Sequence, residues 1–171
     1  MPDFLNPNEV LKKLRLRKNM IAADFGCGSG GWTIPLAKIL AEGKVYAIDI
    51  LEEPLSALRA KVKIERLFNV ETRKANAEKG VLLLSNSCNL VLMTNLLFEC
   101  ENKKAVLEEA KRILKPAGKI LVVDWLKDNP LTPEIEWLDF EEIKKIAEEL
   151  NLKLEKEFEA GTYHQGLLLT K

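Results

Sequence analysis

Positions 20–32 read Met-Ile-Ala-Ala-Asp-Phe-Gly-Cys-Gly-Ser-Gly-Gly-Trp, and three residue patterns follow one another within them. An apolar run reaches Asp24, a glycine-dense turn follows, and a helical pattern begins at Trp32. Glycine has no Cβ, so it accepts positive φ angles and lets a ligand approach the backbone closely. The free N–H groups of such a loop, and of the helix after it, face that ligand. This succession of strand, tight loop and helix predicts an α/β domain with a binding site at the loop.

The glycine spacing is compatible with two cofactors. Gly26, Gly28 and Gly31 satisfy the G-x-G-x-x-G pattern of dinucleotide-binding loops. Gly26, Gly28 and Gly30 satisfy the G-x-G-x-G pattern of loops that bind S-adenosylmethionine. A carboxylate at Asp24 would repel a pyrophosphate, whereas it would attract the sulfonium and ammonium groups of S-adenosylmethionine. The charge therefore favours S-adenosylmethionine, and a glycine-rich turn without a ligand is the remaining interpretation.

Composition predicts one domain over residues 1–171, since 47% hydrophobic and 30% charged residues are ordinary for a globular protein. The 26 basic and 26 acidic side chains balance, so no bulk attraction to nucleic acid or anionic membrane is expected. No apolar run predicts a membrane span, and the first residues do not resemble a secretory signal. The spacing of the cysteines fits neither a zinc site nor a disulfide framework, which predicts a reducing, cytoplasmic location and no metal.

Apolar periodicity places further elements in alternation along the chain. Asn6 and Pro7 mark the start of a short helix. Later helices are expected at 32–41, 52–68, 102–114 and 139–150, and strands at 45–48, 70–73, 89–95 and 119–125. The last strands, 152–159 and 165–170, are joined by a turn at 160–164, too short for a helical crossover, so they should be antiparallel. The irregular stretch 125–137 leaves a strand end and is predicted to cover a substrate.

Several segments resemble one known family. Residues 23–30, Ala-Asp-Phe-Gly-Cys-Gly-Ser-Gly, resemble the first motif of class I (Rossmann-like) S-adenosylmethionine-dependent methyltransferases. Residues 112–121 resemble its third motif, with Ala117 in place of the usual second glycine. Residues 115–118 and 160–166 are similar to small methyltransferases of ubiquinone and menaquinone biosynthesis. The resemblance implies a three-layer α/β/α domain with a mostly parallel seven-stranded sheet, in the order 3-2-1-4-5-7-6, that ends in an antiparallel hairpin.

The resemblance also implies which residues hold the cofactor. Asp49 lies 23 residues after Gly26, near the roughly 20 expected for a ribose-binding carboxylate, although it could instead cap the next helix. Where the family commonly has an Asp at the adenine, this chain has Asn76, whose carbonyl accepts a hydrogen bond without charge. The full expected set is Asp24, Gly26, Cys27, Gly28, Gly30, Asp49, Ile50, Asn76, Ala77 and Asn95.

The sequence leaves the acceptor and the catalytic groups open. A sulfonium already activates its methyl group, so a dedicated acid–base pair is optional, and the catalytic candidates are Asn95, Tyr163 and His164. His164 could equally be a residue packed at the hairpin. A small-molecule acceptor is expected, with RNA, through the basic residues 12–18, or a protein as alternatives. A homodimer is compatible with the chain, and an NAD(P)-binding oxidoreductase or a non-catalytic cofactor-binding module are the alternative functions.

Overall fold

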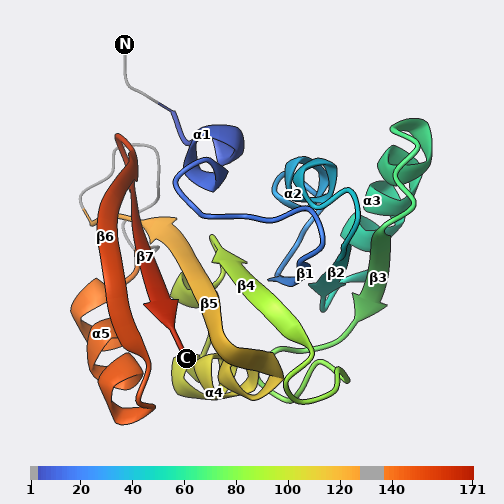
Figure 1. Cartoon of the computed structure of the whole chain (residues 1–171). Helices are drawn as coiled ribbons and strands as arrows, with labels where there is room; N and C mark the ends of the chain where they lie inside the picture. Colours follow the sequence, from blue (N-terminus) through green and yellow to red (C-terminus); the bar gives the residue numbers. More distant parts are fainter. Residues whose placement is uncertain (1–3, 128–136) are drawn as a thin grey trace.

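Apolar runs of the sequence form the strands of one seven-stranded sheet in this computed structural model, which describes residues 4–127 and 137–171 (Figure 1). The strand order is β3-β2-β1-β4-β5-β7-β6, as predicted. The first five strands pair in parallel, and β7 pairs antiparallel with both β5 and β6. The strands are β1 (Ile21–Phe25), β2 (Lys44–Asp49), β3 (Val70–Lys74), β4 (Cys88–Thr94), β5 (Leu114–Trp125), β6 (Lys153–Gly161) and β7 (His164–Thr170).

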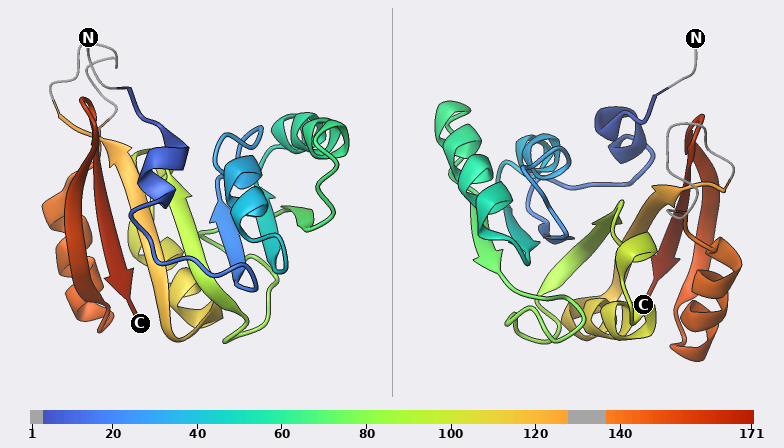
Figure 2. Two further views of the ribbon diagram at one scale, coloured as in Figure 1. Left: turned by 45° about the horizontal axis from the view of Figure 1, so that its top comes forward. Right: turned by 180° about the vertical axis from the view of Figure 1, so that it is seen from behind.

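Helices cover both faces of the sheet because its central strands are apolar on both sides (Figure 2). Along β4, Val91 and Met93 pack into one core and Leu90 and Leu92 into the other, since successive side chains of a strand point to opposite faces. The first core contains α4 (Lys103–Ile113) and α5 (Phe140–Glu149). On the opposite face lie α1 (Pro7–Leu11), α2 (Thr33–Ile39) and α3 (Glu52–Ile64).

Some boundaries differ from those expected. The helix predicted to reach residue 68 ends at Ile64, and Arg66 has a φ of +53° that no helix continues through. β5 begins at Leu114, so residues 115–118, expected as a sharp turn, lie within the strand. The register of β5 against β4 shifts along this part of the strand. Ala117 has a φ of +62°, a conformation in which glycine carries no steric penalty. His164, expected in the hairpin turn, is instead the first residue of β7. Most of the predicted covering stretch, residues 128–136, lies outside the described residues.

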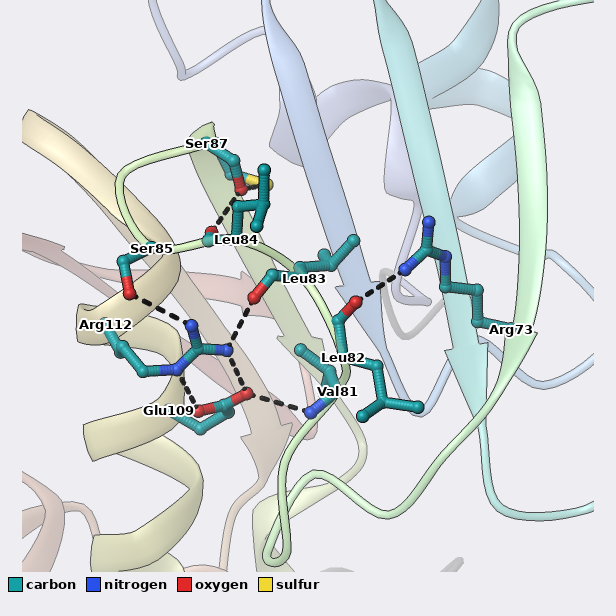
Figure 3. Close-up of polar contacts among 10 residues, drawn as sticks. Arg73, Val81, Leu82, Leu83, Leu84, Ser85, Ser87, Glu109 and Arg112 are labelled. Atoms are coloured by element: carbon teal, nitrogen blue, oxygen red, sulfur yellow. Dashed lines mark hydrogen bonds and ion pairs between the residues drawn. The ribbon is translucent and has the colours of Figure 1, made fainter.

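An irregular segment, residues 75–87, connects β3 to β4 where a crossover helix would otherwise stand (Figure 3). Val81 and Leu83 are buried in the core beside α4, whereas Leu82 and Leu84 are exposed. The backbone of the segment is held by charged side chains from its neighbours. Glu109 accepts from the N–H of Val81 at 2.8 Å, and Arg112 donates to the carbonyl of Leu83 at 2.8 Å. These bonds satisfy backbone groups that no strand or helix pairs.

Gly43 provides a test of the close packing at the start of the sheet. A Cβ at this position would lie 1.8 Å from the carbonyl oxygen of Met20, so Gly43→Ala forces the backbone apart. We expect the variant to lose about 1–3 kcal/mol of unfolding free energy, measured by urea denaturation. Gly31→Ala is the matched control, because a Cβ there meets nothing within 4 Å, and it should remain within about 0.5 kcal/mol of the parent protein. Equal stability of the two variants would contradict this packing.

Candidate functional site

A cavity of about 470 Å³ lies at the carboxyl ends of the parallel strands. Its walls come from the segments that follow β1, β2, β3 and β4, which include Gly28, Asp49, Asn76 and Asn95. Ligands in open α/β sheets bind at this end, where neighbouring strands connect in opposite directions. The volume is in the range of small-molecule sites. A larger cavity, of about 740 Å³ between the N-terminal segment and the β6–β7 hairpin, contains none of the predicted site residues.

The glycine loop after β1 takes conformations that favour glycine at each position of the motif. Gly26, Gly28 and Gly30 have φ angles of +69°, +51° and +94°. A Cβ at Gly26 would lie 2.8 Å from Cδ1 of Leu96, and one at Gly30 would lie 2.3 Å from Cδ1 of Leu58. A Cβ at Gly28 would meet no protein atom within 4 Å, although Gly28 lines the cavity. The space over Gly28 is therefore open to a ligand that contacts the backbone.

Asp49 lies at the end of β2 and joins the glycine loop to the segment before α3. Its Oδ2 accepts a hydrogen bond from the N–H of Gly28 at 2.9 Å, and its Oδ1 accepts one from the N–H of Leu51 at 3.0 Å. The sequence left two roles open for Asp49, ribose binding or helix capping. In the structure, its bond to Leu51 stabilises the turn before α3, and Asp49 also lines the cavity. Each carboxylate oxygen has a further lone pair, so the group can still accept hydrogen bonds from a ligand.

Asn76 lies on the wall formed by the segment after β3. Its Oδ1 accepts from the N–H of Glu78 at 2.8 Å, and its carbonyl accepts from the N–H groups of Lys79 and Gly80. These bonds make a tight turn that fixes the side chain in the cavity wall. The remaining expected residues on this wall are Ile50 and Ala77, and Leu51 and Pro54 add apolar surface that the sequence reasoning did not single out.

Asp24 does not line the cavity, although it was expected among the cofactor-binding residues, near the ammonium group. It is fully buried, and its Oδ2 accepts from the hydroxyl of Thr33 at 2.6 Å, which ties β1 to the first turn of α2. Its Oδ1 has no hydrogen-bond partner among the described residues. Burial raises the pKa of Asp24 to about 7, and the nearby charge of Asp49 adds to that increase. Asp24 therefore holds the base of the loop, and direct contact with a ligand stays a prediction.

Cys27 and Gly30, also expected at the cofactor, lie in the same loop but not on the cavity wall. Cys27 is buried against Leu55 and Leu58, and burial raises the pKa of its thiol, so the residue is a small packing group and not a reactive thiolate. Of the three catalytic candidates, Asn95 lines the cavity, whereas Tyr163 and His164 do not. His164 contacts Asn95, with 2.9 Å between its Nε2 and the Oδ1 of Asn95.

Asp124 supports the cavity wall without lining it, and the sequence reasoning missed it. It is buried near the end of β5 and accepts hydrogen bonds from the N–H groups of Leu97 and Phe98 at 3.0 and 3.3 Å. These bonds hold the turn that follows β4 and carries Asn95. Burial raises the pKa of Asp124 to about 6. An acid near the end of an apolar strand, in Val-Val-Asp-Trp, was the signal that could have revealed it.

The cavity wall is acidic. Asp49, Glu78 and Glu99 line it, and no lysine, arginine or histidine of residues 4–127 and 137–171 does. Such a wall attracts a cation and repels a pyrophosphate. Together with the open space over Gly28 and the unpartnered oxygen of Asp24 behind the loop, this charge fits S-adenosylmethionine, which carries a sulfonium and an ammonium group. The described residues contain no cluster of three or more metal-ligating side chains.

Asp24 should give the stability of the protein a measurable pH dependence. Its pKa is near 3.8 when unfolded and about 7 when folded, so in that range the folded state holds a proton that the unfolded chain releases. The unfolding free energy contributed by this site therefore falls as pH rises from about 4 to about 7. Asp24→Asn cannot ionise and still accepts from Thr33, so its decline should be smaller, by up to about 1.4 kcal/mol per pH unit.

Urea denaturation of both proteins across this pH range measures the difference. His164, whose pKa burial lowers to about 4, acts in the opposite direction in both proteins alike and cancels in the comparison. The same pH slope in the parent protein and in Asp24→Asn would show that the buried carboxyl does not titrate in this range.

Known proteins are similar to this chain in sequence and in fold. The family model described as "Methyltransferase domain" matches residues 23–122. A demethylmenaquinone methyltransferase of Geobacillus stearothermophilus is 34% identical over 111 residues, which are 64% of this chain and 47% of that protein. The enzyme of the same name from Listeria welshimeri is 33% identical over 71% of this chain and 51% of its own length. The chain thus spans about half the length of the curated relatives it matches.

Solved structures extend the similarity over the whole fold. A SAM dependent methyltransferase from Aquifex aeolicus matches with a TM-score of 0.90 and 31% identity, over 97% of this chain and 89% of that one. A chain from Sulfolobus solfataricus that is described as a type 11 methyltransferase matches with a TM-score of 0.77 and 29% identity, over 98% of this chain and 94% of that one. None of the helices in residues 4–127 and 137–171 has the length and apolar character to span a bilayer. The chain belongs to the methyltransferase domain family, and the S-adenosylmethionine cofactor expected from its glycine motif is the cofactor of that family.

Proposed function

We propose that this chain transfers a methyl group from S-adenosylmethionine to a small-molecule acceptor. The observation that carries the proposal is the acidic cavity beside Gly28 and Asp49, at the strand ends where a family member would hold this cofactor. The charge of the wall disfavours the alternative of a nicotinamide dinucleotide, whose pyrophosphate is anionic. A non-catalytic binding module would share the cavity, and only turnover separates it from an enzyme.

The residues of the cavity have distinct roles in the proposal. Gly26 and Gly28 let the cofactor approach the backbone, and the Asp49 carboxylate accepts hydrogen bonds from its ribose hydroxyls. Asn76 and Ala77 contact the adenine, and Asn95 lies against the methionine portion. The bound cofactor supplies a methyl carbon that its positive sulfur has already activated. The protein aligns the acceptor with that carbon and excludes water, so a strong general base is not required.

A small, apolar acceptor is supported by the relatives named as demethylmenaquinone methyltransferases. The RNA alternative depends on the basic residues 12–18, none of which lines the cofactor cavity, and it stays open to test. Arg15 and Arg17 line a separate cavity with Met20 and Asn89, at the amino ends of β1 and β4. The cofactor cavity is at the carboxyl ends of the same strands, so Arg15 and Arg17 do not line it, and Lys13 lines a different cavity with the β6–β7 hairpin. The cysteines are free, which fits a reaction in the reducing cytoplasm.

Ligand-induced thermal stabilisation tests the cofactor. A ligand at 100 times its dissociation constant stabilises the folded state by about 2.7 kcal/mol, so S-adenosylmethionine should raise the melting temperature by several degrees. NAD and NADP should leave it unchanged. Transfer of radiolabelled methyl groups to extracted small molecules, compared with extracted RNA and protein, then identifies the acceptor class. Stabilisation by NAD alone would overturn the proposal, and labelling confined to RNA or protein would overturn the acceptor class.

Asp49→Ala should weaken cofactor binding by about 1–3 kcal/mol, the range for lost hydrogen bonds to a charged group. Titration calorimetry measures this difference. Glu52→Ala is the matched control, because Glu52 is three residues further on, pairs with Arg59 and does not line the cavity, so its affinity should be that of the parent protein. If Asp49→Ala binds as tightly as Glu52→Ala, Asp49 is not part of the cofactor site.

A further inference from the structure

Asn95 turns the chain out of β4 at the wall of the cofactor cavity. Its φ is +49°, in the left-handed region, and its N–H donates to the carbonyl of Val123 on β5 at 2.8 Å. Asn tolerates this conformation better than most non-glycine residues, and a hydrogen-bond partner selects one among the rotamers of its side chain. The orientation of the Asn95 side chain at the cavity wall therefore depends on what its amide contacts.

The amide of Asn95 contacts His164, the first residue of β7. β7 is separated from β4 by β5, so the contact crosses a strand at the carboxyl end of the sheet. His164 is 5% exposed and pairs in register with Trp125. The two rings lie with centroids 3.9 Å apart, tilted by 41°. Packing against Trp125 thus leaves the imidazole little freedom to turn away from Asn95.

The contact between these residues favours one tautomer of the imidazole ring. Because the Oδ1 of Asn95 can only accept, its 2.9 Å contact with the Nε2 of His164 is a hydrogen bond when that nitrogen carries the proton. Burial lowers the pKa of His164 to about 4, so the imidazole is uncharged at neutral pH. An uncharged ring with its proton on Nε2 leaves Nδ1 unprotonated and commits the only N–H to Asn95.

We infer that His164 is a positioning residue of the cofactor site, whose Nε2–H orients Asn95 from the antiparallel hairpin. His164 does not line the cavity, so it acts through Asn95 and not on the reacting atoms. This assignment separates it from the general base considered from the sequence, because a ring that donates through Nε2 accepts no proton there. The inference rests on the proposed cofactor site, but the contact between His164 and Asn95 can be measured without a cofactor.

The tautomer is directly observable because the chain contains one histidine. Long-range ¹H–¹⁵N NMR of the labelled protein distinguishes the two neutral tautomers and the imidazolium without assignment of other residues. We expect the tautomer with the proton on Nε2, unchanged as the pH is lowered from about 8 to about 5. A proton on Nδ1, or a titration midpoint near the ordinary value of 6.5, would overturn the inference.

Calorimetric titration with S-adenosylmethionine tests whether the contact acts on the site. His164→Phe keeps a ring against Trp125 but removes the donor, so the dissociation constant should rise about 10-fold. His164→Gln retains an amide donor and should restore affinity to within about 3-fold of the parent protein. The double variant His164→Phe/Asn95→Ala should bind as Asn95→Ala does, since the lost contact is the same. Gln165→Ala is the control and should bind normally, because Gln165 is the next residue of β7, donates to Glu157 and does not line the cavity.

Each result decides between a positioning and a purely structural role. Parent-like binding by His164→Phe, no rescue by His164→Gln, or additive effects in the double variant would overturn the inference while leaving the cofactor assignment intact. Absence of binding by the parent protein would overturn the proposed function together with it. If His164→Phe does not fold, the comparison of His164→Gln with Asn95→Ala and the NMR tautomer still decide.

Discussion

The carboxylate of Asp49 accepts hydrogen bonds from two backbone N–H groups, and the candidate site depends on this arrangement. It joins the end of β2 to the glycine loop that follows β1, so two neighbouring strand ends form one wall. The bond to Gly28 holds the loop in a conformation with positive φ, which leaves open space above it. An ionised carboxylate suits this role because it accepts several hydrogen bonds at once and still presents charge to the cavity.

Buried polar side chains hold the other parts of the same edge. Asp24 ties β1 to α2 through Thr33, and Asp124 holds the turn after β4 through the backbone of Leu97. His164 reaches the same turn from β7 through Asn95. Groups of this kind are costly to bury, and hydrogen bonds offset that cost only when their geometry is fixed. The edge that carries function is therefore more polar and more constrained than the apolar sheet that supports it.

Particular residues show why some features could be predicted and others could not. Strand order and helix placement follow from apolar periodicity and from the resemblance of residues 23–30 and 112–121 to a known family. The expected site residues Gly26, Gly28, Asp49, Asn76 and Asn95 share one cavity because motifs at the ends of parallel strands converge. The predicted helix ends were less accurate. The end of α3 at Ile64 was missed because Arg66, in the left-handed conformation, stops the helix there. Asp124 was missed because its partners are distant in sequence.

The sequence by itself determined the alternation of elements, the glycine loop and the family, since these are local patterns of apolar spacing and motif. Only the tertiary structure decided that Asp24 faces Thr33 and not the cavity, and that His164 contacts Asn95 69 residues away. It also decided that the acidic side chains Asp49, Glu78 and Glu99 surround one cavity while the arginines near residue 15 lie at the other end of the strands. The physical reason is that burial and electrostatic environment depend on side chains brought together across strands, which no local pattern encodes.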